Sequence, residues 1–306
     1  MKKNGIIKRV RFHGRGGQGM KTASRIVGTA AFIEGYYAQD FPVYGAERRG
    51  APIMAFTRLS DYPILERGII THPDINIIAD ETLLSDNAAK VLQGVGSGTV
   101  TMVNTHYTPS HVKNIYDVKG EVAAVDITDT VLKIINKPAL SSVAAACACK
   151  LTGMISKGAL EEAVARELKD IHLKRKSIDK NIEAALICFD NTPDISATGF
   201  KHSEGYNENM VIRLVYADPC VGTPSVYAMG NTIDKKTGNW RLFKPVIDHE
   251  ECSMCRACFV HCPHSCISID ESGYPQIDYK NCKGCFACMD ECPKGAISKE
   301  REVRAW

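Results

Sequence analysis

Apolar and polar residues follow two rhythms in the first part of the chain. Short apolar runs, some alternating with polar residues, predict strands at 6–12, 53–59, 75–79, 99–103 and 122–125. Apolar residues at helical spacing predict helices at 21–34, 83–92, 141–151, 158–171 and 177–188. Because strands and helices are interleaved along the sequence, this part of the chain is expected to be an α/β domain.

The predicted domain opens with a strand, a glycine-rich loop and a helix. Gly14, Gly16 and Gly19 match the pattern GxGxxG, with Gly17 between them, and Asp40 follows about 20 residues later. This order predicts a Rossmann-like fold and leaves dinucleotide binding open, with Asp40 as a ribose ligand. Alternatively, the glycines only let the backbone turn and let a helix or a partner approach closely.

A second loop is predicted at residues 38–52, where Gly, Pro and aromatic residues are frequent. It contains Glu47, Arg48 and Arg49. A solvated ion pair on the surface is one interpretation. The other is an interface or anion-facing loop, because guanidinium groups bind carboxylates and phosphates through two parallel hydrogen bonds.

Two cysteine runs follow near the end of the chain, each with the spacing CxxCxxCxxxCP. Their cysteines are Cys252, Cys255, Cys258 and Cys262, and then Cys282, Cys285, Cys288 and Cys292. This is the pattern of bacterial ferredoxins with two [4Fe–4S] clusters, in which the fourth cysteine of each run binds the cluster of the other run. One cluster is therefore assigned to Cys252, Cys255, Cys258 and Cys292, and the other to Cys282, Cys285, Cys288 and Cys262. Zinc sites use separated cysteine pairs, and disulfide frameworks occur in small secreted chains, so both explain the runs less well.

The two runs belong to an internal repeat, which predicts a small α+β domain of the bacterial ferredoxin type with pseudo-twofold symmetry. Cys266 has no cysteine counterpart in the second half and is interpreted as a buried free thiol. Apolar residues are expected to shield the clusters from water. They are Ile247, Phe259, Ile267, Ile269, Ile277, Phe286 and Ile297.

The patterns divide the chain into an α/β domain at 1–190, a connector or arm at 191–244 and the cluster domain at 245–306. The connector is rich in Pro, Gly and polar residues, and only 211–216 is predicted as a strand. Cys147 and Cys149 lie in an alanine-rich helix and are interpreted as core residues.

Composition and charge narrow the possible functions. The 306 residues are 44% hydrophobic and 24% charged, as in ordinary globular proteins. No apolar run approaches the roughly 20 residues that a membrane span needs, and no signal peptide is evident. The net charge of +3 includes 10 acidic and 7 basic residues from residue 245 onward, and no basic stripe indicates nucleic-acid binding. The 13 cysteines suit a reducing cytoplasm.

Several motifs together resemble one enzyme family. The segments 13–19 (HGRGGQG) and 41–52 (FPVYGAERRGAP) resemble the gamma subunit of pyruvate:ferredoxin oxidoreductases and their 2-oxoacid relatives. The segment 237–241 (TGNWR), followed by the double cysteine run, resembles the delta subunit of the same family. The chain therefore resembles a natural gamma–delta fusion.

This resemblance implies an electron-transfer subunit of a thiamine-dependent enzyme, with no catalytic residue in this chain. The alpha and beta chains would hold thiamine pyrophosphate, Mg²⁺, a further [4Fe–4S] cluster and the substrate pocket, in a dimer of heterotrimers. Electrons would leave to ferredoxin, and coenzyme A accepts the acyl group in most members. Pyruvate is favoured as substrate, while oxalate or a branched-chain 2-oxoacid stays open.

The resemblance also bears on the glycine loop. It implies that Gly14, Gly16, Gly17 and Gly19, like the loop with Glu47, Arg48 and Arg49, face partner chains or an anion. A different class stays possible at this point: an NAD(P)H-linked iron–sulfur reductase that uses the GxGxxG loop.

Overall fold

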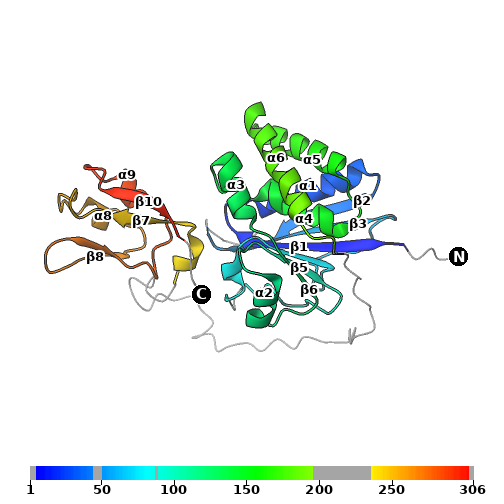
Figure 1. The fold of residues 1–306 in the computed structure, drawn as a ribbon, viewed down its shortest axis with the longest axis horizontal. Coiled ribbons are helices and arrows are strands. Elements are labelled where there is room, and N and C mark those ends of the chain that lie inside the picture. The colour runs from blue at the N-terminus through cyan, green and yellow to red at the C-terminus, as the bar shows by residue number, and fades with distance from the viewer. Residues whose placement is uncertain (1–4, 44–49, 87–88, 196–235, 303–306) are drawn as a thin grey trace, which may run out of the picture. The chain divides into compact units, whose positions relative to one another are not determined.

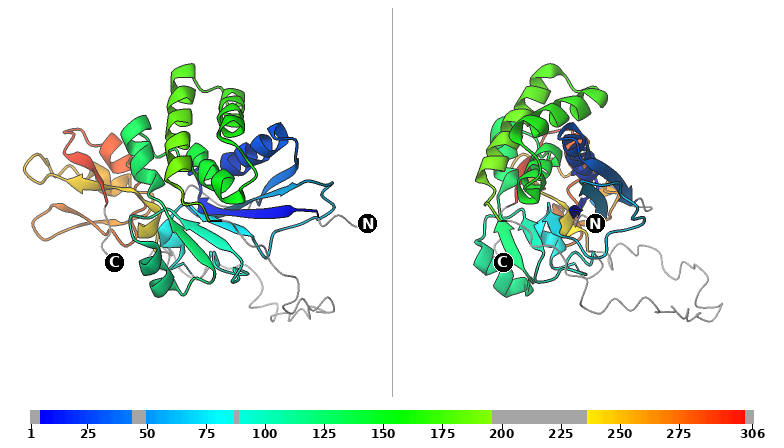
Figure 2. Two further views of the ribbon diagram at one scale, coloured as in Figure 1. Left: turned by 45° about the vertical axis from the view of Figure 1, so that its right-hand side comes forward. Right: turned by 90° about the vertical axis from the view of Figure 1, so that its right-hand side faces the viewer.

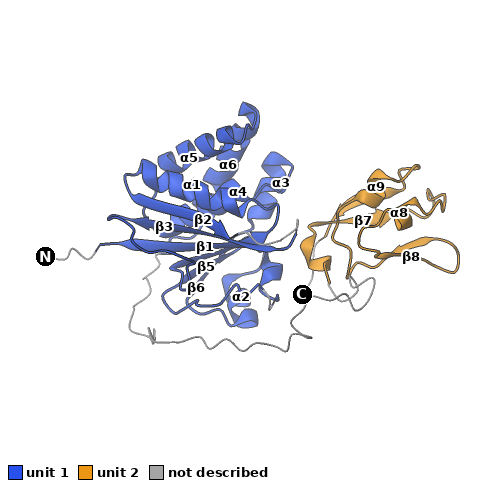
Figure 3. Ribbon diagram, turned by 180° about the vertical axis from the view of Figure 1, so that it is seen from behind, with its two compact units in different colours: residues 1–206 blue, residues 207–306 orange. Residues whose placement is uncertain are grey.

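The computed structural model describes residues 5–43, 50–86, 89–195 and 236–302. The chain forms two compact units, residues 1–206 and 207–306 (Figure 3). The predicted strand at 211–216 and the residues Glu47, Arg48 and Arg49 lie outside the described residues. Within the described segments, none of the helices combines the length and apolar character needed to cross a membrane.

Unit 1 is built around a six-stranded sheet in the order β2-β3-β1-β4-β5-β6 (Figure 1). Its strands are β1 (Ile7–Arg15), β2 (Tyr37–Val43), β3 (Pro52–Ser60), β4 (Ile75–Ile78), β5 (Val100–Val103) and β6 (Glu121–Ala124). Strands β1, β4, β5 and β6 are parallel, whereas β3 is antiparallel to both β1 and β2. The expected α/β domain is confirmed. The Rossmann-like topology is not, because an antiparallel strand lies beside β1.

Helices cover the two faces of this sheet unequally (Figures 1 and 2). Helix α2 (Pro109–Tyr116) lies on one face. The other face carries α1 (Met20–Ile33), α3 (Ile127–Ile135), α4 (Ser141–Thr152), α5 (Lys157–Asp170) and α6 (Arg175–Asn191). Neighbouring strand residues point to opposite sides: Ile77 and Met102 pack into the core under the larger helical layer, and Ile78 and Val103 into the smaller core on the α2 side.

The helix predicted at 83–92 is wrong. Among the described residues 83–86 and 89–92, the only helical element is the end of a short 3₁₀ turn, η1 (Glu81–Leu83), and Lys90 has a positive φ of 46°. In the described part of this segment, the Val91 carbonyl accepts hydrogen bonds from two side chains of the sheet, Arg11 (3.0 Å) and Asn76 (3.1 Å). A carbonyl held in this way is not available to a helical ladder.

The loop predicted at 38–52 begins instead as a strand. Strand β2 pairs with β3, and the rings of Phe41 and Phe56 stack at 5.0 Å across the pair. Pro42 is tolerated because β2 lies at the sheet edge, where a missing N–H leaves no partner unpaired.

Unit 2 consists of two similar halves, each with a cysteine loop, a short helix and strands. Strand β7 (Phe243–Ile247) pairs with β10 (Ile297–Arg301), and β8 (Ile267–Ile269) pairs with β9 (Pro275–Ile277). The helices are α8 (Ala257–Val260) and α9 (Ala287–Asp290), and the 3₁₀ turn η3 (Gly238–Trp240) precedes β7.

Backbone contacts repeat between the halves. The Asp248 N–H donates to the Ala296 carbonyl, and the Asp278 N–H donates to the Cys266 carbonyl, both at 2.8 Å. Ala296 and Cys266 are therefore structurally equivalent positions.

Candidate iron–sulfur sites and the glycine loop

Four cysteines surround one space in unit 2, which we call site A. They are Cys252, Cys255, Cys258 and Cys292. The first three come from the loop before α8 and from α8 itself, and the fourth follows α9. Cys258 is buried, whereas Cys255 is exposed. The structure thus brings together the set that the sequence assigned to one cluster.

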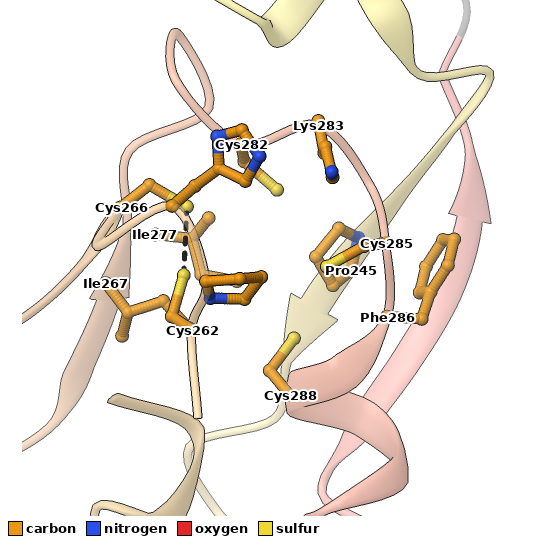
Figure 4. Close-up of a pocket in the computed structure, with 12 residues that line it drawn as sticks. Pro245, Cys262, Cys266, Ile267, Ile277, Cys282, Lys283, Cys285, Phe286 and Cys288 are labelled. Atoms are coloured by element: carbon orange, nitrogen blue, oxygen red, sulfur yellow. Dashed lines mark hydrogen bonds between the residues drawn. The ribbon is translucent and has the colours of Figure 1, made fainter. Parts of the chain in front are cut away.

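A second space, site B, is lined by the other predicted set. Its cysteines are Cys262, Cys282, Cys285 and Cys288, and Cys266 lines it as well. Figure 4 shows the sulfur atoms of these residues arranged around a common space. Cys282 and Cys288 are 6% and 7% exposed, while Cys285 is open to the surface. Each site therefore combines both halves of the repeat and has one exposed cysteine.

The local backbone explains why three close cysteines can face one space. Arg256 and Phe286 have φ values of 63° and 64° immediately before α8 and α9. This left-handed residue reverses the chain between the second and third cysteine of each run. The equal angles in both halves give the two sites matching frameworks.

The set of donor atoms is informative about the group that fits. Site A and site B are each lined by four predicted cysteine ligands, three from one run and one from the other. This donor set fits a [4Fe–4S] cluster, which is held by four thiolates.

Cys266 is close to one member of site B. Its Sγ lies 3.4 Å from that of Cys262, and it lines the same pocket as Cys282. Interaction with Cys266 lowers the pKa of Cys262 to about 5 and the pKa of Cys282 to about 7, while burial acts in the opposite direction. The pKa of Cys266 is raised by the same interactions and by burial.

Arg241 fixes the loop that enters site B. Its guanidinium group donates to the carbonyls of Tyr279 (2.5 Å) and Cys282 (2.6 Å), and it pairs with Glu302 at 2.6 Å. Gly284 passes so close that a methyl group there would lie 2.7 Å from the Phe243 carbonyl oxygen. The sequence reasoning did not single out Arg241 beyond its place in the TGNWR motif.

The apolar shell is only partly as predicted. Ile267 and Ile297 are buried between the two halves, and Ile247 and Ile277 pack against them. Phe259, however, is 47% exposed, so its expected role in excluding water is wrong. It lies on the outer side of the four-residue helix α8, and that helix buries only Cys258.

The glycine loop of unit 1 is filled by the protein's own side chains. The Gln18 side chain accepts from the Arg15 N–H (2.7 Å) and donates to Asp80 (3.0 Å), and Arg15, which is 1% exposed, also pairs with Asp80 at 3.1 Å. A methyl group at Gly14 would lie 2.5 Å from Cγ of Met20. The glycine therefore makes room for the chain's own packing.

The start of α1 is closed in the same way. At Gly19, where φ is 81°, a methyl group would lie 2.9 Å from Cβ of Ser141 at the start of α4. Asp40 is paired with Thr57 in the middle of the edge strand β2 and packs near Gly28 of α1. It does not stand at the end of a parallel strand beside β1, where a ribose-binding acid belongs. These contacts disfavour dinucleotide binding at the loop.

His13 belongs to the HGRGGQG motif, but no role was predicted for it from the sequence. It is 2% exposed in β1, and its Nε2 has no hydrogen-bond partner among the described residues. Burial, with a smaller effect of the nearby Arg11, lowers the pKa of His13 to about 3. The imidazole is therefore neutral at physiological pH.

Two known families match the chain, one in each of its two units. Residues 9–190, more than half of the chain, match the family described as pyruvate ferredoxin/flavodoxin oxidoreductase. The chain belongs to this family. Residues 234–296 match a 4Fe-4S dicluster domain. The predicted resemblance to a fused gamma–delta subunit of these oxidoreductases is confirmed.

Individual relatives of the family align with unit 1. The common gamma subunit of the pyruvate/ketoisovalerate oxidoreductases of Thermococcus kodakarensis is 39% identical over 156 residues, which cover 51% of this chain and 83% of that protein. Pyruvate synthase subunit PorC of Methanothermobacter marburgensis is 35% identical over 181 residues, or 59% of this chain and 95% of that subunit. The crystal structure of pyruvate oxidoreductase subunit PORC from Thermotoga maritima is 29% identical, with a TM-score of 0.52, covering 61% of this chain and 97% of that one. The chain is thus a subunit of an oxidoreductase. The three alignments cover 51–61% of the chain, and the rest of its length lies outside them.

Proposed function

We propose that the chain is the electron-transfer subunit of a thiamine-dependent 2-oxoacid:ferredoxin oxidoreductase. The observation that carries this proposal is the pair of four-cysteine sites, each drawn from both halves of unit 2. Cys252, Cys255, Cys258 and Cys292 would hold one [4Fe–4S] cluster, and Cys282, Cys285, Cys288 and Cys262 the other. When bound, such a cluster accepts and releases one electron at a time.

The chain's own residues would bind, orient and insulate. The thiolates fix each cluster, and the isoleucines between the two halves keep water from its inner side. Cys255 and Cys285 are exposed, so one edge of each cluster would lie near the surface. This arrangement suits electron entry and exit by contact with other proteins.

The partners are inferred from the family. The alpha and beta chains would hold thiamine pyrophosphate, Mg²⁺, a further [4Fe–4S] cluster and the substrate, and ferredoxin would be the acceptor. We propose a cytoplasmic dimer of heterotrimers in which residues 191–244 connect the domains 1–190 and 245–306. The relatives support this view in that they are gamma and PorC subunits of larger enzymes.

Pyruvate is the proposed substrate. The support is twofold. The relatives are named for pyruvate, some of them together with ketoisovalerate, and the segment 47–52 (ERRGAP) resembles the corresponding loop of the pyruvate branch of the family. Oxalate and branched-chain 2-oxoacids are the competing substrates to be tested beside it.

The glycine loop and the arginine loop are proposed to serve assembly. Gly14 and Gly19 have little free space beside them. From the family resemblance we propose that Gly14, Gly16, Gly17 and Gly19, packed in this way, shape a surface for the partner chains. Glu47, Arg48 and Arg49 would contact those chains or an anionic group near them.

Visible absorbance of the native complex, purified without oxygen, tests the function. Pyruvate with coenzyme A, other 2-oxoacids, oxalate and NADH are added to separate samples, and dithionite serves as the control reductant. Bleaching of the iron–sulfur band by pyruvate with coenzyme A is expected. Bleaching by NADH alone, or by dithionite alone, would contradict the proposal.

A further inference from the structure

The two cysteine sites differ at one equivalent position. Cys266 lines site B, whereas Ala296 occupies the corresponding place in site A. The backbone around both residues is alike: their carbonyls accept from Asp278 and Asp248 at 2.8 Å. At this equivalent position, site B therefore has a thiol and site A has a methyl group.

The Cys266 thiol lies beside a predicted ligand of site B. Its Sγ is 3.4 Å from that of Cys262, which belongs to the first run, and it lines the same pocket as Cys282, which opens the second run. Cys266 itself is 7% exposed, so water does not compete for this contact. Figure 4 shows the thiol beside Cys262 at the rim of the shared space.

The thiol is placed as a donor and not as a fifth ligand. A [4Fe–4S] cluster takes four thiolates, and site A is complete without a cysteine at position 296. A metal-bound cysteine is a thiolate, which accepts hydrogen bonds but cannot donate them. The proton in the contact between Cys266 and Cys262 must therefore come from Cys266.

We propose that Cys266 is a positioning residue that donates an S–H hydrogen bond to the Cys262 sulfur of site B and raises the reduction potential of the cluster bound there. This inference rests on the function proposed above. Reduction adds a negative charge to the cluster, so a donor to its sulfur atoms stabilises the reduced state more than the oxidised one. Two otherwise repeated sites would thereby differ in potential, which favours electron flow in one direction.

Three variants of the full chain, purified without oxygen, test the role of the thiol. Cys266→Ala removes the donor, Cys266→Ser replaces it with a hydroxyl donor, and Ala296→Cys introduces a thiol at the equivalent position of site A. Iron content is measured first. The potentials of both clusters are then determined by redox titration followed by electron paramagnetic resonance.

We expect Cys266→Ala to weaken reduction of one cluster about tenfold, which is 59 mV for one electron. Cys266→Ser should recover part of this loss. Ala296→Cys should shift the other cluster in the opposite direction, and this variant separates the thiol from other differences between the sites, such as Arg241 beside Cys282.

Unchanged potentials in Cys266→Ala and Ala296→Cys, with full iron in both, would overturn the inference while leaving the proposed function intact. If Cys266→Ala fails to retain iron, the shifts in Cys266→Ser and Ala296→Cys decide, and no shift in either overturns the inference. Absence of cluster iron from the unmodified chain would instead contradict the proposed function itself.

Discussion

The glycine loop of unit 1 and the cysteine runs of unit 2 differ in what occupies the space that they enclose. Beside the glycines stand the chain's own Met20, Gln18 and Ser141. The cysteines of site A and those of site B each line a pocket of their own. Both motifs are recognisable in the sequence. The difference shows that a sequence motif predicts a binding site only when the side chains that pack around it are also known.

The largest expected effect comes from opening one of the sulfur sets. Cys255→Ser should lower bound iron by about half, because each of the two clusters contains four irons. Ferredoxin reduction should stop, while thiamine-dependent decarboxylation by the complex should persist in part. Iron analysis and both activities are measured on the anaerobic complex. Cys188→Ala, which changes a buried cysteine outside both sites, is the control and should keep all the iron.

A second variant tests whether the loop with Arg48 and Arg49 contacts the partner chains. Arg48→Ala combined with Arg49→Ala should reduce co-purification of the alpha and beta chains several-fold, since paired guanidinium groups are strong partners for carboxylates at interfaces. The matched control is Arg166→Ala with Arg175→Ala, which removes two exposed arginines from helices α5 and α6. Equal recovery of partner chains from both double variants would refute an interface at the loop.

A third variant tests the close packing at the glycine loop. Gly19→Ala adds a side chain at a φ of 81° and at 2.9 Å from Ser141, so it should cost about 2–4 kcal/mol of stability from backbone strain and overpacking together. Gly35→Ala has a similar φ of 85° but meets nothing within 4 Å, and it should cost only the strain of about 1–2 kcal/mol. Denaturant unfolding followed by helical circular dichroism compares the two. Equal losses would show that the loop has spare room.

The smallest effect concerns the buried imidazole of His13. Its pKa of about 3 in the folded protein lies below the ordinary value of 6.5, so the unfolded chain binds the proton first and stability falls as pH drops through 6.5. Between pH 7 and pH 5 this amounts to about 2 kcal/mol. His13→Gln should show a correspondingly flatter pH dependence of the unfolding free energy. A slope identical to that of the unmodified protein would mean that His13 is not buried as a neutral group.

The cysteine sites could be predicted because their chemistry is encoded in local spacing. Three cysteines separated by two residues each can face one space when a left-handed residue stands in each gap, as Met254 and Arg256 do in the first run and Gly284 and Phe286 in the second. The repeat fixes which distant cysteine completes each set. The mainly apolar strands β4 and β5 could also be predicted from local sequence. All four residues of each strand are buried, and three of the four are apolar.

What sequence reasoning missed depends on contacts between distant segments. The segment at 83–92 has apolar spacing suited to a helix, but Arg11 and Asn76 hold the Val91 carbonyl from the sheet. Strand β2 contains Phe41 and Pro42, which suggest a loop until the pairing with β3 is known. Likewise, only the position of Met20 and Ser141 shows that the GxGxxG pattern is a packing device.

Each site in unit 2 takes cysteines from both halves of the repeat, and this affects when the sites can form during synthesis of the chain. On the ribosome, Cys252, Cys255 and Cys258 emerge well before Cys292, so site A stays open until the second run has been made. Site B waits equally, because three of its members belong to that run, and β10 closes the unit by pairing with β7. A prematurely terminated chain would therefore contain a complete first cysteine run and no closed site. Loading of the two proposed clusters would thus require that both cysteine runs have been made.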